Sequence, residues 1–134
     1  MKAGPILVVG LGCQRGCPAS ALRALLDRTL LAHGIALDEV RALASIDLKH
    51  DEPGLLELAE QLALPLTCFT AEQLSGYQGQ LSHRSRIAFE RTGCHGIAES
   101  AALALAEQLG FSPATLRVTR QKGPQATLAL ATTS

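Results

Sequence analysis

Aromatic side chains are scarce in this sequence, and neither sign of charge dominates. Aromatic residues make up 3% of the 134 residues, so the core must be assembled from the aliphatic residues that bring the hydrophobic fraction to 47%. Twelve Lys and Arg residues balance twelve Asp and Glu residues, which gives a formal net charge of zero. This balance argues against general binding of nucleic acids or anionic membranes, because both need a net basic surface. A net charge of zero is still compatible with a local basic rim around one pocket.

Long apolar runs and closely paired cysteines are also missing. No run reaches the roughly 20 apolar residues of a membrane-spanning helix, and the N-terminus has no signal-peptide pattern. We therefore expect a cytoplasmic protein. The four cysteines, Cys13, Cys17, Cys68 and Cys94, form no C-x-x-C pair. In a reducing compartment we interpret them as free thiols packed as small hydrophobic groups, in preference to a metal site made by Cys13, Cys17, Cys94 and His95. No metal and no cofactor is expected.

Short apolar runs alternate with helical spacing of leucine and alanine along the chain, which predicts an α/β domain spanning residues 1–134. The expected strands cover residues 6–9, 43–46, 66–69, 116–119 and 127–130. The first expected helix begins at Pro18, in position N1, and ends at Gly34 as its C-terminal cap. A second helix begins at Pro53, and a short one follows a capping box of Thr70 and Gln73. Two more are expected over 84–91 and 97–109, and Gly110 ends the last one. Residues 75–83 are expected to form a mobile loop.

The connections between these elements predict the architecture. The first two strands flank a helix and form a βαβ unit, which makes them parallel. The last two strands are separated by a short Gly-Pro turn and therefore form an antiparallel hairpin. We predict a three-layer αβα fold on a mixed sheet of about five strands.

The segment from Gly10 to Gly16 follows the first strand and precedes a helix. Glycines at such a place let backbone N–H groups approach a ligand, and a helix N-terminus attracts negative charge. We favour an anion-binding loop for a carboxylate or phosphate over a purely structural turn. A dinucleotide site is the weaker alternative, because Arg15 stands where the third glycine of that fingerprint belongs.

A charged loop follows the second strand. In an open α/β sheet, ligands bind outside the carboxyl ends of the strands, which is where this loop lies. Asp47, Lys49 and Glu52 have the chemistry to bind and polarise a substrate or to move protons. The alternative is that Asp51 or Glu52 caps the helix that begins at Pro53.

Two glycines precede the last predicted helix, as they do the first one. Thr92, Gly93 and Gly96 lead into it, and Glu99 falls in its first turn. Glu99 either complements the helix dipole or serves as a catalytic carboxylate. His95 has the pKa range of an acid–base group, but a lone loop histidine is weak evidence.

Cations gather in the last hairpin, in the run Arg120, Gln121 and Lys122. They either contact ligand carboxylates from the side or protect an edge strand from aggregation. We expect residues 10–16, 47–52 and 92–99 to converge on one cleft at the carboxyl edge of the strands, because these loops are the richest in glycine and charge.

These segments together resemble a known family, formed by the C-terminal domain of CbiG and its stand-alone relative CobE. The matching patterns are G-x-G-C-x-R-G at 10–16, S-I-D-L-K-x-D-E-P-G-L at 45–55, F-x-A-E-x-L at 69–74, T-G-x-x-G-I-A-E at 92–99 and Gln121-Lys122. The resemblance covers about residues 7–130 and implies a role in cobalamin (vitamin B12) biosynthesis. CbiG opens a lactone of cobalt-precorrin-5A in the anaerobic route. The 134 residues have no room for its N-terminal and central regions, which points to the stand-alone branch of the aerobic route.

The resemblance implies a ligand, a precorrin or corrinoid ring fringed with acetate and propionate groups. We predict that the chain binds these carboxylates, with other cobalamin-pathway enzymes as further partners. The predicted ligand-binding residues are Gly10, Gly12, Cys13, Arg15, Gly16, Asp47, Lys49, Thr92, Gly93, Gly96, Glu99, Gln121 and Lys122. The first alternative is a hydrolase acting on a precorrin-5-type intermediate, with Asp47, Glu52, Glu99 or Cys13 as candidate catalytic residues. The second alternative is a nucleotide- or phosphate-binding module.

Overall fold

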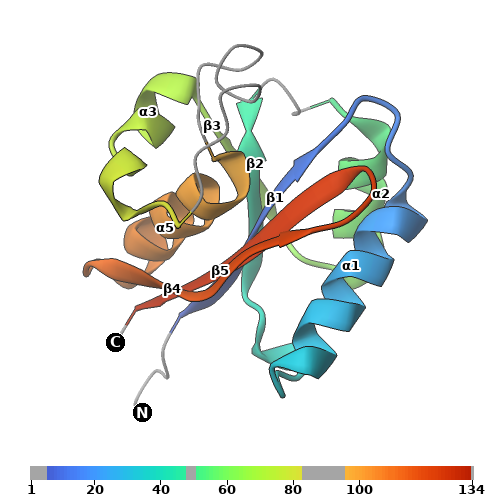
Figure 1. The fold of residues 1–134 in the computed structure, drawn as a ribbon, viewed down its shortest axis with the longest axis horizontal. Helices are drawn as coiled ribbons and strands as arrows, with labels where there is room; N and C mark the ends of the chain where they lie inside the picture. Colours follow the sequence, from blue (N-terminus) through green and yellow to red (C-terminus); the bar gives the residue numbers. More distant parts are fainter. Residues whose placement is uncertain (1–5, 48–50, 83–95, 134) are drawn as a thin grey trace.

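A central mixed sheet organises the protein in the computed structural model, which describes residues 6–47, 51–82 and 96–133 (Figure 1). Its strands are β1 (Leu7–Cys13), β2 (Ala42–Ile46), β3 (Leu66–Phe69), β4 (Ala114–Lys122) and β5 (Ala126–Thr133), in the order β3-β2-β1-β5-β4. Strands β1, β2 and β3 are parallel, β5 runs antiparallel to β1, and β4 and β5 form the antiparallel hairpin. The predicted mixed sheet of five strands is confirmed.

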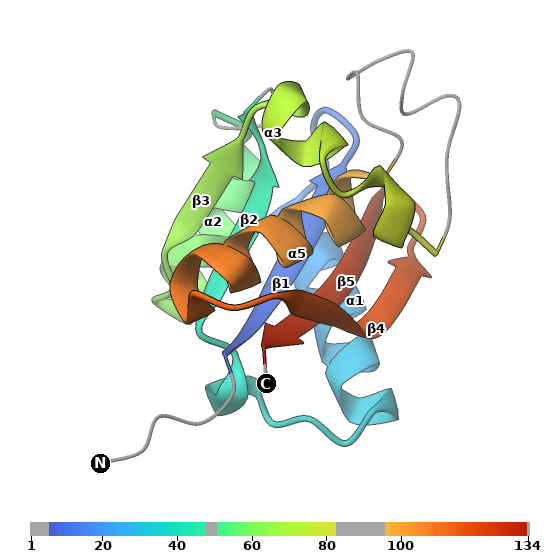
Figure 2. The same ribbon diagram turned by 90° about the vertical axis from the view of Figure 1, so that its left-hand side faces the viewer.

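Helices cover both faces of this sheet and complete the three-layer αβα architecture (Figures 1 and 2). One face carries α1 (Ala19–Ala32) and α2 (Pro53–Leu62), and the other carries α5 (Ile97–Gly110) and the short α3 (Ala71–Ser75). Successive side chains of a strand point to opposite faces. Val9 and Leu11 therefore join the core under α1 and α2, whereas Val8 joins the core under α5.

The core under α5 is built from small side chains. Ala98, Ala101, Ala102 and Ala106 are buried in it. A Cβ atom added to Gly10 would lie 1.9 Å from the carbonyl oxygen of Ala98, far inside the contact distance. Glycine and alanine thus let the helix lie directly on the sheet, and this close packing explains how the core forms with so few aromatic residues.

Some element ends differ from the prediction. Pro18 is the N-cap of α1 and precedes the first helical residue. Gly34 has a positive φ of 65° after α1, as a C-terminal glycine should. Gly110 does not stop α5 but is its last residue, and Phe111 takes the left-handed conformation with a φ of 53°. Gly110 instead makes room for Thr133, whose Oγ1 would lie 2.6 Å from an added Cβ.

The segment that follows α3 is anchored to the rest of the fold, so the expected mobile loop is wrong for its described part. It contains a 3₁₀ turn at Gln78–Gln80. The Tyr77 hydroxyl donates a hydrogen bond to Glu107 of α5 at 2.8 Å, and the Gln80 amide donates to the Ala114 carbonyl of β4 at 3.3 Å. The capping box of Thr70 and Gln73 is confirmed. The expected helix over 84–91 lies outside the described residues. None of the helices within the described ranges has the length and apolar character needed to cross a bilayer.

Candidate functional site

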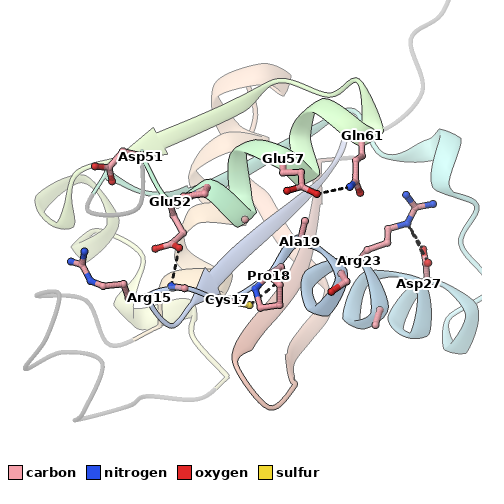
Figure 3. Close-up of a pocket in the computed structure, with 15 residues that line it drawn as sticks. Arg15, Cys17, Pro18, Ala19, Arg23, Asp27, Asp51, Glu52, Glu57 and Gln61 are labelled. Carbon is pink, nitrogen blue, oxygen red and sulfur yellow. Dashed lines mark hydrogen bonds and ion pairs between the residues drawn. The ribbon is translucent and has the colours of Figure 1, made fainter.

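The loop between β1 and α1 is tied to its neighbours on two sides. The Gly16 N–H donates a hydrogen bond to Oε2 of Glu52 at 2.9 Å, as Figure 3 shows. On the other side, the Gln14 N–H donates to the Gln125 carbonyl of the β4–β5 hairpin at 2.9 Å. Gly16 has a φ of 82°, a conformation that favours glycine. The backbone on both sides of Arg15 is therefore held in place.

Glu52 does not cap α2, although it occupies the N-cap position. Its side chain makes no capping hydrogen bond and reaches across to Gly16 instead, with the residue only 7% exposed. Asp51 is exposed and precedes the N-cap by one residue. The interpretation of these carboxylates as helix caps is therefore wrong for Glu52. Pro53 does begin the helix, as expected.

Gly54 brings the first turn of α2 against the same loop. A Cβ atom at Gly54 would lie 2.0 Å from the Cys17 carbonyl oxygen, so any side chain would push α2 away. Sequence reasoning missed this role and used Gly54 only as one position of the family pattern. The signal available was a glycine inside the first turn of a helix, since such a glycine often marks close backbone approach.

A groove of about 820 Å³ opens between α1, α2 and this loop (Figure 3). Most of its polar side chains are already paired: Arg23 contacts Asp27 at 3.0 Å, and Gln61 donates to Glu57 at 3.0 Å. Arg15 lies at one end of the groove, is exposed, and makes no ion pair with any residue of the described ranges. Of the two arginines that line the groove, Arg15 is thus the one that has no ion-pair partner among the described residues.

Gly10 and Gly12 lie in β1 and not in a loop, which corrects the sequence-based position of the glycine-rich segment. Gly10 pairs with Ala44 of β2 and with Ala129 of β5, so its backbone lies inside the sheet. An added Cβ at Gly12 would lie 3.0 Å from Oγ1 of Thr127. These two glycines make room for neighbouring elements, and the exposed loop consists of the residues after Cys13.

Glu99 belongs to the first turn of α5 and is buried on the opposite face of the sheet. It is 1% exposed, and its two carboxylate oxygens accept hydrogen bonds from the Ser82 N–H and the Arg120 N–H, each at 2.8 Å, and from the Ser82 hydroxyl. Glu99 therefore joins three parts of the chain. Glu52 lies on the α1–α2 side of the sheet and Glu99 on the α5 side, whereas Gly10 and Gly12 lie directly against Ala98 and Ile97 of α5. Two of the three segments therefore meet in their described residues, and a cleft shared by all three stays a prediction.

The remaining predicted residues are scattered around the carboxyl edge and the hairpin. Asp47 is exposed at the end of β2, and Gly96 is the N-cap of α5. The Gln121 amide donates to the Thr119 carbonyl at 3.0 Å, and Lys122 is exposed. Lys49, Thr92, Gly93 and His95 lie outside the described residues, and their roles stay predictions.

Three cysteines, Cys13, Cys17 and Cys68, form no disulfide within the described residues, and Cys94 lies outside them. Burial, followed by the charge of Glu52, raises the pKa of Cys17. Burial, followed by the charge of Asp47, raises the pKa of Cys68. Both effects favour the protonated thiol, which is a poor nucleophile. Cys13 is half-buried and packs against the core under α1.

The fold places the chain among the αβα domains built on a mixed five-stranded sheet. Within this class, the family model described as "Cobalamin synthesis G C-terminus" matches residues 7–131. The chain belongs to this family and is a cobalamin biosynthesis protein, which confirms the resemblance seen in the motifs.

Named relatives agree with this assignment. The chain is 43% identical to Protein CobE of Sinorhizobium sp. over 102 residues, which cover 76% of this chain and 66% of the relative. It is 29% identical over 126 residues to a cobalt-precorrin-5A hydrolase of Priestia megaterium, covering 94% of this chain and 32% of that protein. The chain thus spans slightly less than two thirds of the first relative and about a third of the second.

Solved structures match the fold. A crystal structure of CobE, a protein from the cobalamin biosynthetic pathway, superposes with a TM-score of 0.95 at 46% identity, covering 100% of this chain and 94% of that one. The cobalamin biosynthesis protein chiG of Agrobacterium tumefaciens superposes with a TM-score of 0.74 at 31% identity, covering 96% of this chain and 99% of that one.

Proposed function

We propose that the chain binds a precorrin or corrinoid intermediate of cobalamin biosynthesis through the carboxylate groups at the edge of the ring. The observation that carries this proposal is the state of Arg15. Its guanidinium is exposed at the end of the α1–α2 groove and has no ion-pair partner among the described residues, while the backbone on both sides is tied down. A guanidinium on a fixed loop is suited to a carboxylate, which it binds with two parallel hydrogen bonds.

Two features near Arg15 favour an anionic ligand, against the acidic side chains of Asp51 and Glu57 that also line the groove. The N-terminus of α1, a helix of 14 residues, begins shortly after Arg15 and contributes partial positive charge. Lys122, exposed at the end of β4, is a second cation for the fringe of the ring. Lys49 is proposed as a third, on the resemblance alone.

Hydrolysis of a precorrin-5-type intermediate is the second candidate, because the relatives from Priestia megaterium and Salmonella typhimurium are named cobalt-precorrin-5A hydrolases. Two of the four proposed catalytic groups are already engaged: Glu52 accepts from Gly16, and Glu99 accepts from Ser82 and Arg120. Asp47 and Cys13 are the other two proposed catalytic groups, and a role for either in this activity stays a prediction. Binding needs fewer assumptions and is the function we put first.

A titration series tests binding. The purified protein is titrated with a corrinoid whose acetate and propionate groups are free acids, with its amidated counterpart, and with a nucleotide, while the corrin absorbance or the binding heat is followed. Tight binding of the free acid and weak binding of the other two ligands is the expected result. Equal binding of the amidated corrinoid would contradict recognition through carboxylates, and binding of the nucleotide alone would favour the phosphate-binding alternative.

Two arginine variants sharpen this test. Arg15→Ala should weaken binding of the free acid by about 1.5–3 kcal/mol, the contribution of a hydrogen bond between charged groups. Arg23→Ala is the matched control, because Arg23 lines the same groove but is paired with Asp27. Lys49→Ala is expected to act like Arg15→Ala. Incubation with a precorrin and mass spectrometry of the products tests turnover, and turnover lost in Asp47→Asn with binding retained would establish the hydrolase instead.

A further inference from the structure

We propose that Glu52 is a positioning residue, which fixes the loop that presents Arg15 to the anionic ligand; this inference rests on the proposed function. Glu52 Oε2 accepts the Gly16 N–H at 2.9 Å, directly after Arg15 in the chain. The two partners are 36 residues apart in sequence, so the contact exists only in the folded protein. Its effect is to join the loop after β1 to the loop before α2.

The hydrogen bond from Gly16 to Glu52 is one of three that fix the backbone before and after Arg15. The Gln14 N–H is bound to the Gln125 carbonyl at 2.9 Å, and the Cys17 N–H is bound to the Gln14 carbonyl at 3.1 Å. Without Glu52, the N–H of Gly16 would have no protein acceptor among the described residues. Gly16 has a φ of 82°, which glycine adopts without steric cost because it has no Cβ atom. For the same reason glycine also adopts other backbone conformations readily. A hydrogen bond at this residue therefore has a direct effect on where Arg15 points.

The geometry argues against a direct action of Glu52 on the ligand. The residue is 7% exposed, and its carboxylate is directed at the loop backbone rather than along the groove (Figure 3). Gly54, two residues later, holds the first turn of α2 against the Cys17 carbonyl, which keeps Glu52 within reach of Gly16. A carboxylate held in this way orders its neighbour, and a free negative charge beside an anionic ligand would oppose binding.

Three variants separate positioning from direct action. Glu52→Gln keeps an oxygen that can accept the Gly16 N–H but removes the charge, whereas Glu52→Ala removes both. Glu60→Gln is the charge control, because Glu60 is an exposed glutamate of the same helix, α2, and does not line the groove. Each protein is titrated with the free-acid corrinoid, and the hydrogen exchange of the Gly16 amide is measured by NMR. Circular dichroism verifies that every variant is folded.

The expected result has two parts. Glu52→Ala should speed the Gly16 exchange and weaken binding, each by about tenfold or more, as expected for the loss of one hydrogen bond to a charged acceptor. Glu52→Gln should stay within about threefold of the wild type in both measurements, and Glu60→Gln should match the wild type.

Three outcomes would overturn the proposal. In the first, Glu52→Gln loses binding as fully as Glu52→Ala while Gly16 stays protected, which would mean that the carboxylate acts on the ligand itself. In the second, Glu52→Ala leaves the Gly16 exchange unchanged. In the third, the exchange rises but binding is unaffected. If the wild-type protein binds no corrinoid, the proposed function fails, and the Gly16 exchange still decides whether Glu52 holds the loop.

Discussion

Glu52 and Glu99 are two buried carboxylates from two charged motifs, and they differ in how completely they are satisfied. Glu99 lies in the first turn of α5, and both of its oxygens accept hydrogen bonds, two from backbone N–H groups and one from a hydroxyl. Glu52 lies on the α1–α2 side and, within the part of the chain that the structure describes, accepts one hydrogen bond through one oxygen. In the sequence the two look alike, since each is an acidic residue near a helix N-terminus.

The difference separates a structural carboxylate from one next to a binding surface. Glu99 replaces water with protein donors on both oxygens and connects α5, β4 and the segment ending at Ser82. Glu52 serves a single loop beside an open groove. We infer that the α5 face supplies stability and that the α1–α2 face supplies the ligand-binding loop. The following predictions test that division, starting with the largest expected effect.

Removing the two carboxylates should affect stability unequally. Glu99→Ala removes a buried carboxylate that accepts three hydrogen bonds and should lower the free energy of unfolding by about 2–4 kcal/mol, since one hydrogen bond to a charged group contributes ~1.5–3 kcal/mol and water partly replaces the acceptor at the half-buried Arg120 and the exposed Ser82. Glu52→Ala should cost about 1 kcal/mol, because the Gly16 N–H lies in an exposed loop where water replaces the acceptor. Urea unfolding of both variants measures the difference. Equal losses would contradict the division between the two faces.

Glycine substitutions extend the comparison to the backbone. Gly10→Ala places a Cβ atom 1.9 Å from the Ala98 carbonyl oxygen and should destabilise the protein by about 3 kcal/mol, because α5 must move off the sheet. Gly54→Ala meets the Cys17 carbonyl at 2.0 Å, and we expect it to displace the ligand loop and weaken corrinoid binding more than Gly10→Ala does. Gly79→Ala is the control, since no atom lies within 4 Å of its added Cβ. Thermal melts and corrinoid titrations of the three variants measure these effects.

The fold was accessible from sequence because periodicity is a local signal. Apolar runs, the Pro53 start and the Thr70–Gln73 capping box depend on neighbours a few residues away, and the structure has them where expected. The extent of β1 was missed because glycines in a strand look like a turn. Within β1, Gly10 leaves room for α5, and Gly12 leaves room for α5 and β5. These two elements lie far along the chain, so no local pattern reveals that the glycines belong to a strand.

The candidate site was harder to predict for the same physical reason. The motif residues of the Gly10–Gly16 and Asp47–Glu52 segments do meet, through Gly16 and Glu52, as sequence reasoning expected. The partners of Glu99 were not accessible, because Ser82 and Arg120 carry no pattern that marks them as donors to a carboxylate 17 and 21 residues away. Such contacts depend on how the helices and strands pack.

The α5 face should also give the protein a stability limit at high pH. Burial, together with the hydrogen bond to Glu107 and its charge, raises the pKa of Tyr77 to about 12, against about 10 in an unfolded chain. The folded state therefore keeps the phenol proton longer than the unfolded state. The stabilisation is complete below about pH 10 and is lost as the pH rises towards 12. Tyr77→Phe should cost about 1 kcal/mol at neutral pH.

The measurement for Tyr77 is the difference in unfolding free energy between wild type and Tyr77→Phe across this pH range. That difference should shrink between about pH 10 and 12 and stay constant below pH 9. Using the difference cancels the titration of lysines that both proteins share. A constant difference up to pH 12 would show that Tyr77 does not bind its proton more tightly in the folded state.

The smallest expected effect concerns how the helices of the two faces end. After α1, the left-handed position is filled by Gly34, with a φ of 65°, whereas after α5 it is filled by Phe111, with a φ of 53°. A side chain in this conformation costs roughly 1–2 kcal/mol, and Phe111 recovers little by packing, because it is 93% exposed. Its N–H bond to the Glu107 carbonyl, at 2.9 Å, does not depend on the side chain.

Phe111→Gly should therefore raise the free energy of unfolding by about 0.5–1 kcal/mol after the added flexibility of the unfolded chain is subtracted. Gly34→Ala, the reciprocal change on the other face, should lower it by about 1 kcal/mol. Urea unfolding of both variants measures the pair, and a loss of stability in Phe111→Gly would show that the exposed ring makes a stabilising contact in solution.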